Sequence, residues 1–133
     1  MDMIINGEMV SGSDTFSVTN PFDESTVDRV PLAGRAEAES AIIAAHSARD
    51  SMRSLSARKI SDKLYDVADE LKAQMDPLAE MITLESGKPI RFSRDEVRRS
   101  VETAILCAEE ARRLYGESIP MDAAIGGGGL YGF

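Results

Sequence analysis

The stretch Glu85-Ser86-Gly87-Lys88-Pro89, called the corner below, constrains the fold most, because it separates two amphipathic helical patterns. Before it, apolar residues recur on one helical face at Leu78, Met81 and Ile82. Gly87 can adopt the left-handed conformation that closes a helix, and Pro89 cannot prolong one. Helical spacing then resumes at Val97, Val101, Ala104, Ile105, Ala108, Arg112 and Tyr115. The corner therefore predicts a sharp turn at which two helices meet.

The remaining helix boundaries can be predicted from capping residues and periodicity. A narrow, Ala-rich face from Gly34 to Leu55 predicts a helix that permits close packing, with Ala38, Ala41, Ile42, Ala45, Arg49 and Met52 on that face. Ser56 is the expected N-cap of the next helix, whose apolar stripe is Ile60, Leu64, Val67, Ala68 and Leu71. Asp76-Pro77 should cap and start the short helix before the corner. The last helix is expected from Ile90 or Ser93 to Tyr115, with Gly116 ending it.

Strand patterns are confined to the first 31 residues. Asn6-Gly7 tolerates positive φ at both positions, so the apolar residues on either side predict a β-hairpin. Alternation over residues 15–19 predicts a strand with Phe16 and Val18 on one face, ended by Asn20-Pro21. Residues 26–31 repeat the alternation and are the expected partner strand.

Size and charge restrict the function. A chain of 133 residues suits one domain, and its formal charge of −8 opposes binding to nucleic acid or to an anionic membrane. One cysteine permits no internal disulfide, and no transmembrane-length apolar run or export signal is visible. We therefore expect a cytoplasmic protein with neither kind of partner.

The residues alone indicate no catalytic chemistry. Cys107 lies in mid-helix at the edge of the apolar stripe, which predicts a buried structural thiol rather than a nucleophile. His46 is the only histidine, so we interpret it as a partly exposed helix residue and not as a zinc ligand. Gly126 to Gly129 lack the Lys-Ser/Thr of a phosphate loop and are interpreted as a flexible linker. We expect no catalytic residue and no cofactor-binding residue in this chain.

Six segments, taken in order, resemble the N-terminal part of the aldehyde dehydrogenase superfamily. The similarity is to lactaldehyde, succinate-semialdehyde and non-phosphorylating glyceraldehyde-3-phosphate dehydrogenases. The corner matches the family's Glu-Thr/Ser-Gly-Lys-Pro signature. The other matching segments are residues 3–8, 16–21 and 40–48, Glu96-Val97 with residues 108–111, and residues 116–120.

The resemblance implies an α/β fold for the full enzyme, of which this chain would supply an N-terminal β-hairpin and short strands followed by about four helices. Residues 1–121 would be the N-terminal part of the cofactor-binding domain, and residues 122–133 a Gly-rich linker with the start of the next strand. Nothing here matches the family's nucleophilic cysteine, glutamate base or cofactor loop. The implied function is an N-terminal portion of an NAD(P)-dependent enzyme that oxidises an aldehyde to a carboxylic acid. NAD or NADP would bind the complete enzyme, and this chain alone would be inactive and bind neither.

The resemblance also implies a substrate entrance. Arg99, Thr103 and Leu106 share one helical face, which in family members lines the substrate tunnel. The hypothesis is that Arg99 meets an anionic aldehyde, because guanidinium binds carboxylate and phosphate well. The alternative is an ordinary solvated arginine.

A cation site is a weaker implication. Several family members hold a monovalent cation between backbone carbonyls before the Asn-Pro pair and an acidic side chain of the signature. The corresponding residues here are Val18, Thr19 and Glu85, and oxygen ligands of this kind suit a hard cation. The alternative is a helix-terminal glutamate that lies near Lys88.

A rival interpretation is a free-standing helical module that binds a partner or self-associates without enzymatic activity. Apolar residues on the outer helix face and in the tail favour the enzyme portion, since an independent small protein would carry polar residues there; these are Leu106, Ile125, Leu130, Tyr131 and Phe133. The expected partners are the remainder of the dehydrogenase, or further copies in a homo-oligomer, and a small aldehyde in the complete enzyme.

Overall fold

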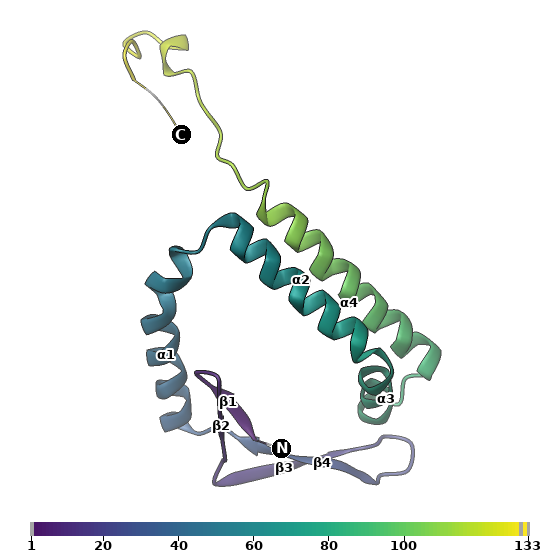
Figure 1. The fold of residues 1–133 in the computed structure, drawn as a ribbon. Helices are drawn as coiled ribbons and strands as arrows, with labels where there is room; N and C mark the ends of the chain where they lie inside the picture. The colour runs from purple at the N-terminus through teal and green to yellow at the C-terminus, as the bar shows by residue number, and fades with distance from the viewer. Residues whose placement is uncertain (1, 131, 133) are drawn as a thin grey trace.

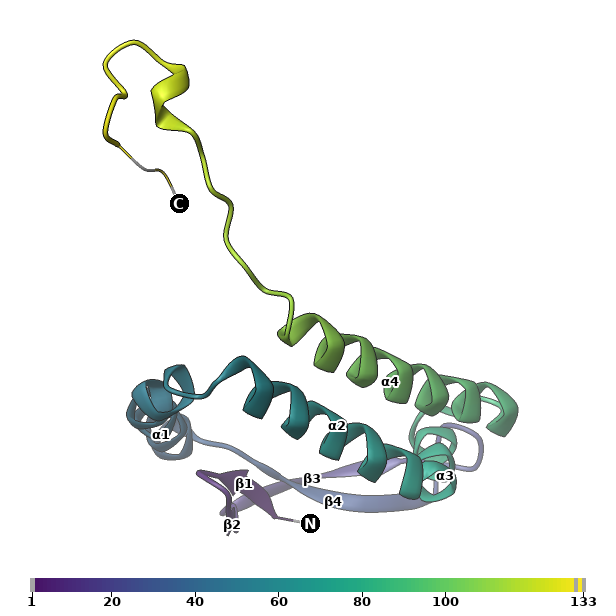
Figure 2. The ribbon, with the colours of Figure 1, turned by 45° about the horizontal axis from the view of Figure 1, so that its top comes forward.

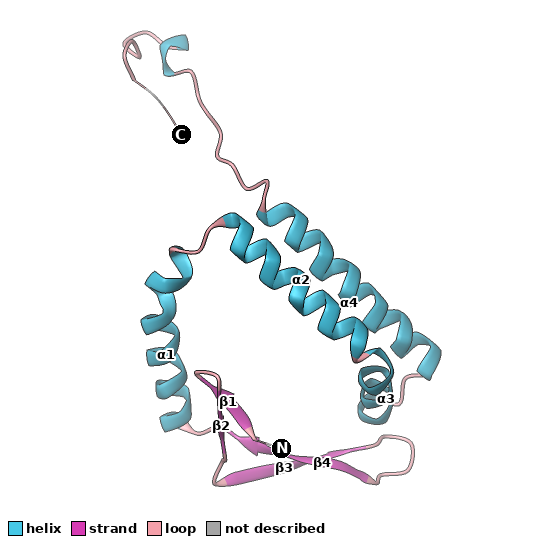
Figure 3. Cartoon of the chain, in the orientation of Figure 1, coloured by secondary structure: helices cyan, strands magenta, loops and turns pink. Residues whose placement is uncertain are grey.

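Two small antiparallel sheets precede four helices in the computed structural model, which describes residues 2–130 and 132 (Figures 1 and 3). The elements are β1 (Met3–Ile5), β2 (Glu8–Val10), β3 (Asp14–Thr19), β4 (Thr26–Leu32), α1 (Arg35–Arg53), α2 (Ala57–Ala73), α3 (Met75–Ser86), α4 (Ile90–Ala111) and a 3-10 turn at Met121–Ala123. This order confirms the prediction of short strands followed by about four helices.

Both predicted strand pairings are confirmed. Asn6 and Gly7 have φ values of 56° and 79°, so their positive φ closes the β1–β2 hairpin, in which Met3 pairs with Val10. In the second sheet β3 pairs with β4, from Asp14 opposite Leu32 to Thr19 opposite Thr26, with an irregularity between Val18 and Thr19.

The core lies between α2, α3 and α4. Figure 2 shows α4 alongside α2, and the two helices run antiparallel. Their buried residues are mostly small, which allows the helix backbones to approach closely; they are Ser61 and Ala68 of α2, Ala79 of α3, and Ser93, Val97, Val101, Ala108 and Ala111 of α4.

Arginine side chains tie α4 to the helices beside it at two points. Near its C-terminal end, Arg112 donates to Ser61 Oγ at 2.9 Å and to Asp62 Oδ1 at 3.0 Å. In its first half, Arg94 donates to Asp76 Oδ1 at 3.1 Å. These bonds fix the position of α4 along α2 and α3.

The predicted stripe of α2 is largely left uncovered. Ala68 is its one buried member, whereas Ile60 and Val67 are exposed. The contact with α4 is made at the edge of this stripe, at Ala68, and at the neighbouring Ser61. The prediction of a helix is confirmed, but its most regular apolar residues lie beside the core.

The close packing expected along α1 is also absent within the described residues. No residue of α1 is buried, and Ile42 is 68 % exposed. Ala41 and Ala45 line a shallow groove with Ile4 and Ile5 of β1. In the ribbon α1 diverges from the α2–α4 pair (Figure 1).

Helix boundaries confirm one capping prediction and correct two. Ser56 accepts the amide of Lys59, as a helix N-cap should. Asp76, in contrast, lies inside the first turn of α3, because that helix already begins at Met75. The last helix ends at Ala111 and not at Tyr115, which is 83 % exposed. Helix stability in proteins comes mainly from packing, and every residue from Arg112 to Gly126 is exposed.

Candidate functional site

The corner has the geometry that the sequence predicts. Gly87 closes α3 in the left-handed conformation, with φ 68° and ψ 9°, and its amide donates to Thr83 O at 2.9 Å. The amide of Lys88 donates to Ser86 Oγ at 3.3 Å. Pro89 is the N-cap residue of α4, so α3 and α4 meet here as expected.

The corner also touches the end of the β3–β4 hairpin. A Cβ added to Gly87 would lie 3.0 Å from Pro21 Cγ. The Asn-Pro pair that follows β3 therefore packs on the C-terminal end of α3. Two segments that are distant in sequence thus form one local site.

An ion pair and a hydroxyl pair join the two sides of the corner. Lys88 Nζ bonds the Glu96 carboxylate of α4, and both side chains are part-buried. The hydrogen bond from Lys88, and then the charge of its ammonium, lowers the pKa of Glu96. Thr83 Oγ1 and Ser93 Oγ lie 2.9 Å apart within hydrogen-bond distance.

The Lys88–Glu96 pair was not predicted from the sequence. Helical periodicity relates residues only within one helix, and Pro89 stands between these two. The available signal was a basic residue at a helix break, Lys88, followed by an acidic residue in the next helix, Glu96. This pattern does not specify the angle between the two helices, so it does not predict that the side chains meet.

The three candidate entrance residues lie together on the exposed side of α4. Thr103 Oγ1 donates to Arg99 O at 2.9 Å, which holds the threonine hydroxyl against its own helix. Leu106 is 60 % exposed and Arg99 is exposed. The structure thus places an arginine, a threonine and a leucine on one outward face.

The candidate cation ligands lie on the two segments that meet at the corner. Val18 and Thr19 end β3, and Glu85 is in the last turn of α3. The contact between Gly87 and Pro21 brings these segments together, although Thr19 and Glu85 are themselves exposed. Among the described residues no group of three or more His, Cys, Asp or Glu side chains could hold a metal ion. Carboxylate and backbone carbonyl oxygens are ligands that suit a hard cation.

The prediction that Cys107 is buried is wrong, because its side chain is exposed on α4. The packed face of α4 includes the buried Ala108 and the half-buried Ala104 and Ile105, whereas Cys107 points away from it. His46 is likewise exposed on α1. The described residues form no helix long and apolar enough to cross a membrane.

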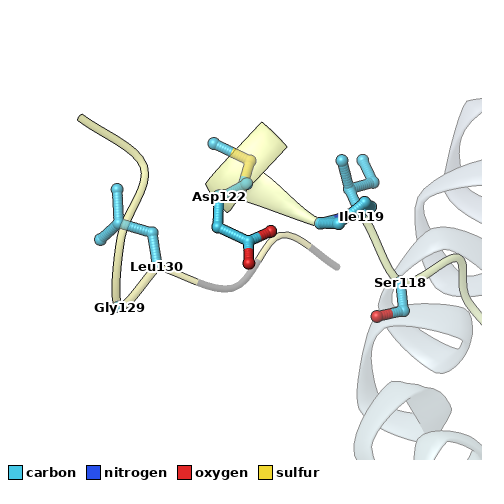
Figure 4. A pocket seen from close by; sticks show the side chains of 7 residues that line it. Ser118, Ile119, Asp122, Gly129 and Leu130 are labelled. Atoms are coloured by element: carbon cyan, nitrogen blue, oxygen red, sulfur yellow. The ribbon is translucent and has the colours of Figure 1, made fainter. Parts of the chain in front are cut away.

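The Gly-rich tail folds back on itself (Figure 4). The amide of Ile119 donates a hydrogen bond to Gly132 O at 2.9 Å. A small pocket of ≈ 300 Å³ is lined by Ser118, Asp122 and Leu130 among others. A Cβ on Gly127 would lie 1.8 Å from Met121 O. The amides of Gly127 and Leu130 donate within the tail, so they are not directed at a phosphate. The predicted strand start at residues 130–133 includes Tyr131 and Phe133, which lie outside the described residues.

Comparison with known proteins identifies related sequences. Residues 9–128 match the Aldehyde dehydrogenase family. A lactaldehyde dehydrogenase of Methanococcus aeolicus is 36 % identical over 120 residues, which is 90 % of this chain and 26 % of that protein. A glutarate-semialdehyde dehydrogenase of Pseudomonas putida is 36 % identical over 118 residues, which is 87 % of this chain and 25 % of that protein. The chain thus spans about a quarter of the length of these relatives.

Solved structures similar to this chain also include aldehyde dehydrogenases. Aldehyde dehydrogenase 21 of Physcomitrella patens, crystallised with the reaction product succinate, matches 98 % of this chain and 27 % of its own with a TM-score of 0.92 and 34 % identity. PnpE in complex with nicotinamide adenine dinucleotide matches 90 % of this chain and 25 % of its own with a TM-score of 0.85 and 29 % identity. The strands and four helices therefore have the arrangement found in one quarter of these larger folds.

Proposed function

Because the chain belongs to the aldehyde dehydrogenase family, we propose that it supplies an N-terminal portion of an NAD(P)-dependent enzyme that oxidises an aldehyde to a carboxylic acid. The family match over residues 9–128 is the observation that carries this proposal. Residues 1–121 would belong to the cofactor-binding domain, and residues 122–133 would lead into the next strand.

In this function the chain acts as a scaffold. The nicotinamide cofactor, when bound to the complete enzyme, accepts the hydride. The amides of Gly127 and Leu130 donate within the tail, and Cys107 lies exposed in the second half of α4. The cofactor and the nucleophile would therefore be held by the part of the relatives that this chain does not match. Alone, the chain would be inactive.

A chimera tests this function directly. This chain would replace the matching quarter of the Pseudomonas putida relative, and reduction of NAD or NADP by glutarate semialdehyde would be followed by absorbance. We expect activity in the chimera and none in this chain alone or in the relative without its matching quarter. A folded but inactive chimera, or turnover by the isolated chain, would contradict the proposal. Turnover by the isolated chain would also show that this chain carries catalytic residues of its own.

The substrate class follows from Arg99. Glutarate semialdehyde carries a carboxylate, and succinate, bound in the solved relative, is a dicarboxylate. An exposed guanidinium on the entrance face of α4 would attract such anions. We expect Arg99→Ala in the chimera to lower kcat/KM for an anionic aldehyde about ten- to a hundredfold, the loss of one charge-assisted bond.

The control for Arg99 is its neighbour Arg98, which pairs with Asp95 at 2.6 Å. Arg98→Ala should leave kcat/KM unchanged, and Arg99→Ala should leave a neutral aldehyde such as lactaldehyde unaffected. Equal losses for charged and neutral aldehydes would show that Arg99 is an ordinary solvated residue.

The corner would bind a monovalent cation through the carbonyls of Val18 and Thr19 and the carboxylate of Glu85. The packing of Gly87 on Pro21 supports this, since it holds the two segments together. The chain should then gain thermal stability in potassium or sodium chloride relative to tetramethylammonium chloride at equal ionic strength. Glu85→Gln should remove that difference, and an unchanged difference would exclude Glu85 as a ligand.

A further inference from the structure

Two apolar grooves lie end to end along α2, beside the face that packs on α4. One, of ≈ 750 Å³, lies at the α1–α2 junction and is lined by Met52, Leu55, Ile60 and Leu64 among others. The second, of ≈ 580 Å³, lies at the α2–α3 junction, and its apolar lining is Val67, Leu71, Pro77, Leu78 and Met81. The residues of α2 that connect them, Ile60, Leu64, Val67 and Leu71, are called the α2 stripe.

The α2 stripe is a continuous apolar surface without a cover in the described structure. A helix of 17 residues is about 25 Å long, and the stripe runs along most of it. Val67 is 49 % exposed. Contiguous apolar surface of this extent on a protein marks an interaction site.

The exposed area indicates the size of the partner. The chain exposes 10520 Å², whereas a compact monomer of 14.4 kDa would expose about 6,800 Å². The excess is about 3,700 Å², of which the extended segment after Ala111 contributes a part. A standard interface covers only about 800 Å² of each partner. One second copy, docked through one two-fold interface, would leave most of the excess exposed.

The exposed apolar side chains also point to a large partner. Besides the α2 stripe, Ile42 and Ile43 are exposed on α1, and Leu106 is exposed on the outer face of α4. These residues belong to separate helices, two of which diverge (Figure 1). A partner that covers them must be a longer polypeptide, and the relatives contain about three times the length of this chain beyond their match to it.

We infer that the α2 stripe is a docking surface for the unmatched three quarters of an aldehyde dehydrogenase chain, and that it binds them even when the two are separate polypeptides. The inference rests on the proposed function. The partner surface must be apolar at its centre. Its rim faces charges of both signs at the first groove, where Lys59 and Lys63 lie with Asp62 and Asp66. At the second groove it faces the acidic Glu70, so a basic side chain is expected opposite that residue.

Mixing the two pieces tests the inference. This chain would be combined with a separately expressed polypeptide containing the part of the Pseudomonas putida relative beyond its match, and binding would be measured by size exclusion and calorimetry. We expect a one-to-one complex. Val67→Asp should weaken it at least about tenfold, because a carboxylate would be buried among apolar side chains.

The matched control is Leu114→Asp, because Leu114 is 84 % exposed and lies outside all three helices of the core. It should weaken the complex less than Val67→Asp does, because Leu114 is not part of the α2 stripe. Circular dichroism of each variant checks the helices, and hydrogen exchange on the wild-type complex gives a readout that needs no variant: amides of α2 and α3 should become protected on binding.

Three results would overturn the inference. They are the absence of a complex with the wild-type chain, a complex that Val67→Asp does not weaken, and a homodimer of this chain that protects α2 and is broken by Val67→Asp. The covalent chimera distinguishes a failure of the docking inference from a failure of the proposed function. An active chimera with no binding between separate pieces leaves the function standing and removes the docking inference, whereas an inactive, folded chimera removes the function.

Discussion

Gly87 determines how the chain turns between α3 and α4. Its left-handed φ of 68° leaves an L side chain strained, and the space that a Cβ would occupy is limited by Pro21. The same residue therefore ends a helix and permits the contact between the corner and the β3–β4 hairpin.

Replacing this glycine should destabilise the chain. We expect Gly87→Ala to lower the free energy of unfolding by about 1–2 kcal/mol, the cost of placing an L residue in the left-handed region. Urea denaturation measures this change in the free energy of unfolding. Gly116→Ala is the control, because Gly116 has open space and no positive φ, and it should change stability by less than about 0.5 kcal/mol. Equal effects of the two substitutions would contradict the role of Gly87.

Glu96 should make stability depend on pH. Its pKa is lowered from 4.5 by the hydrogen bond from Lys88 and by the charge of that ammonium. Because the folded-state pKa lies below the unfolded one, the pair stabilises the fold above pH 4.5, and this contribution is lost as the pH falls through the folded-state value. We expect Glu96→Gln to lower Tm at pH 7, with the difference from wild type shrinking at more acidic pH.

Substitution of Lys88 tests whether its ion pair with Glu96 causes this pH dependence. Lys88→Met should remove the same pH-dependent difference, and Glu96→Gln should then add little in the Lys88→Met background. Additive losses of Tm would show that the two residues act independently, against the ion pair seen between them.

At the scale of elements, α2 forms one side of the α2–α4 packing, the most extensive contact between two helices of the described structure. Its small face packs on α4 through Ser61 and Ala68, its N-terminal end receives Arg112, and its apolar stripe remains available. Its start depends on the hydroxyl of Ser56, which accepts the Lys59 amide at 3.3 Å.

Removing this cap should weaken the whole helical unit. We expect Ser56→Ala to lower the free energy of unfolding by about 1 kcal/mol, the usual cost of losing an N-cap hydroxyl. Thermal unfolding followed by circular dichroism measures the change. Ser100→Ala is the matched control, because the Ser100 hydroxyl donates only to Glu96 O within its own helix and alanine is the better helix former. A loss with Ser100→Ala as large as with Ser56→Ala would contradict the cap.

At the scale of the whole molecule, the buried residues divide the structure unevenly. All the buried apolar side chains described belong to α2, α3 and α4, and none belongs to α1. The free chain therefore contains one packed helical unit, to which α1 and the hairpin are attached more loosely.

Hydrogen exchange should reveal this division. Amides of α4 near Val97 and Val101 should exchange only on global unfolding, whereas amides of α1 should exchange much faster through local opening. Mass spectrometry or NMR of the isolated chain measures both rates. Protection of α1 equal to that of α4 in a monomer would show that α1 is packed more tightly than its exposure indicates.

Local features of the fold were predictable because they depend on neighbouring residues. Asn6-Gly7 specified the first hairpin, Ser56 the start of α2, and Gly87 with Pro89 the corner. The predictions that failed concern residues whose environment is set by distant ones. Cys107 was expected to be buried and is exposed, and α4 ends before Tyr115, where residues 112–126 are all exposed. Of the candidate site, the shared face of Arg99, Thr103 and Leu106 follows from helical spacing.

By itself, then, the amino-acid sequence determined the type and order of the elements, the turn at the corner and the family resemblance. The tertiary structure alone decided that Lys88 meets Glu96, that Gly87 packs on Pro21, and that α4 uses the small face of α2 rather than its apolar stripe. The reason is physical: propensity, capping and periodicity act over a few residues along the chain, whereas the angle at which two helices cross depends on how closely their backbones can approach.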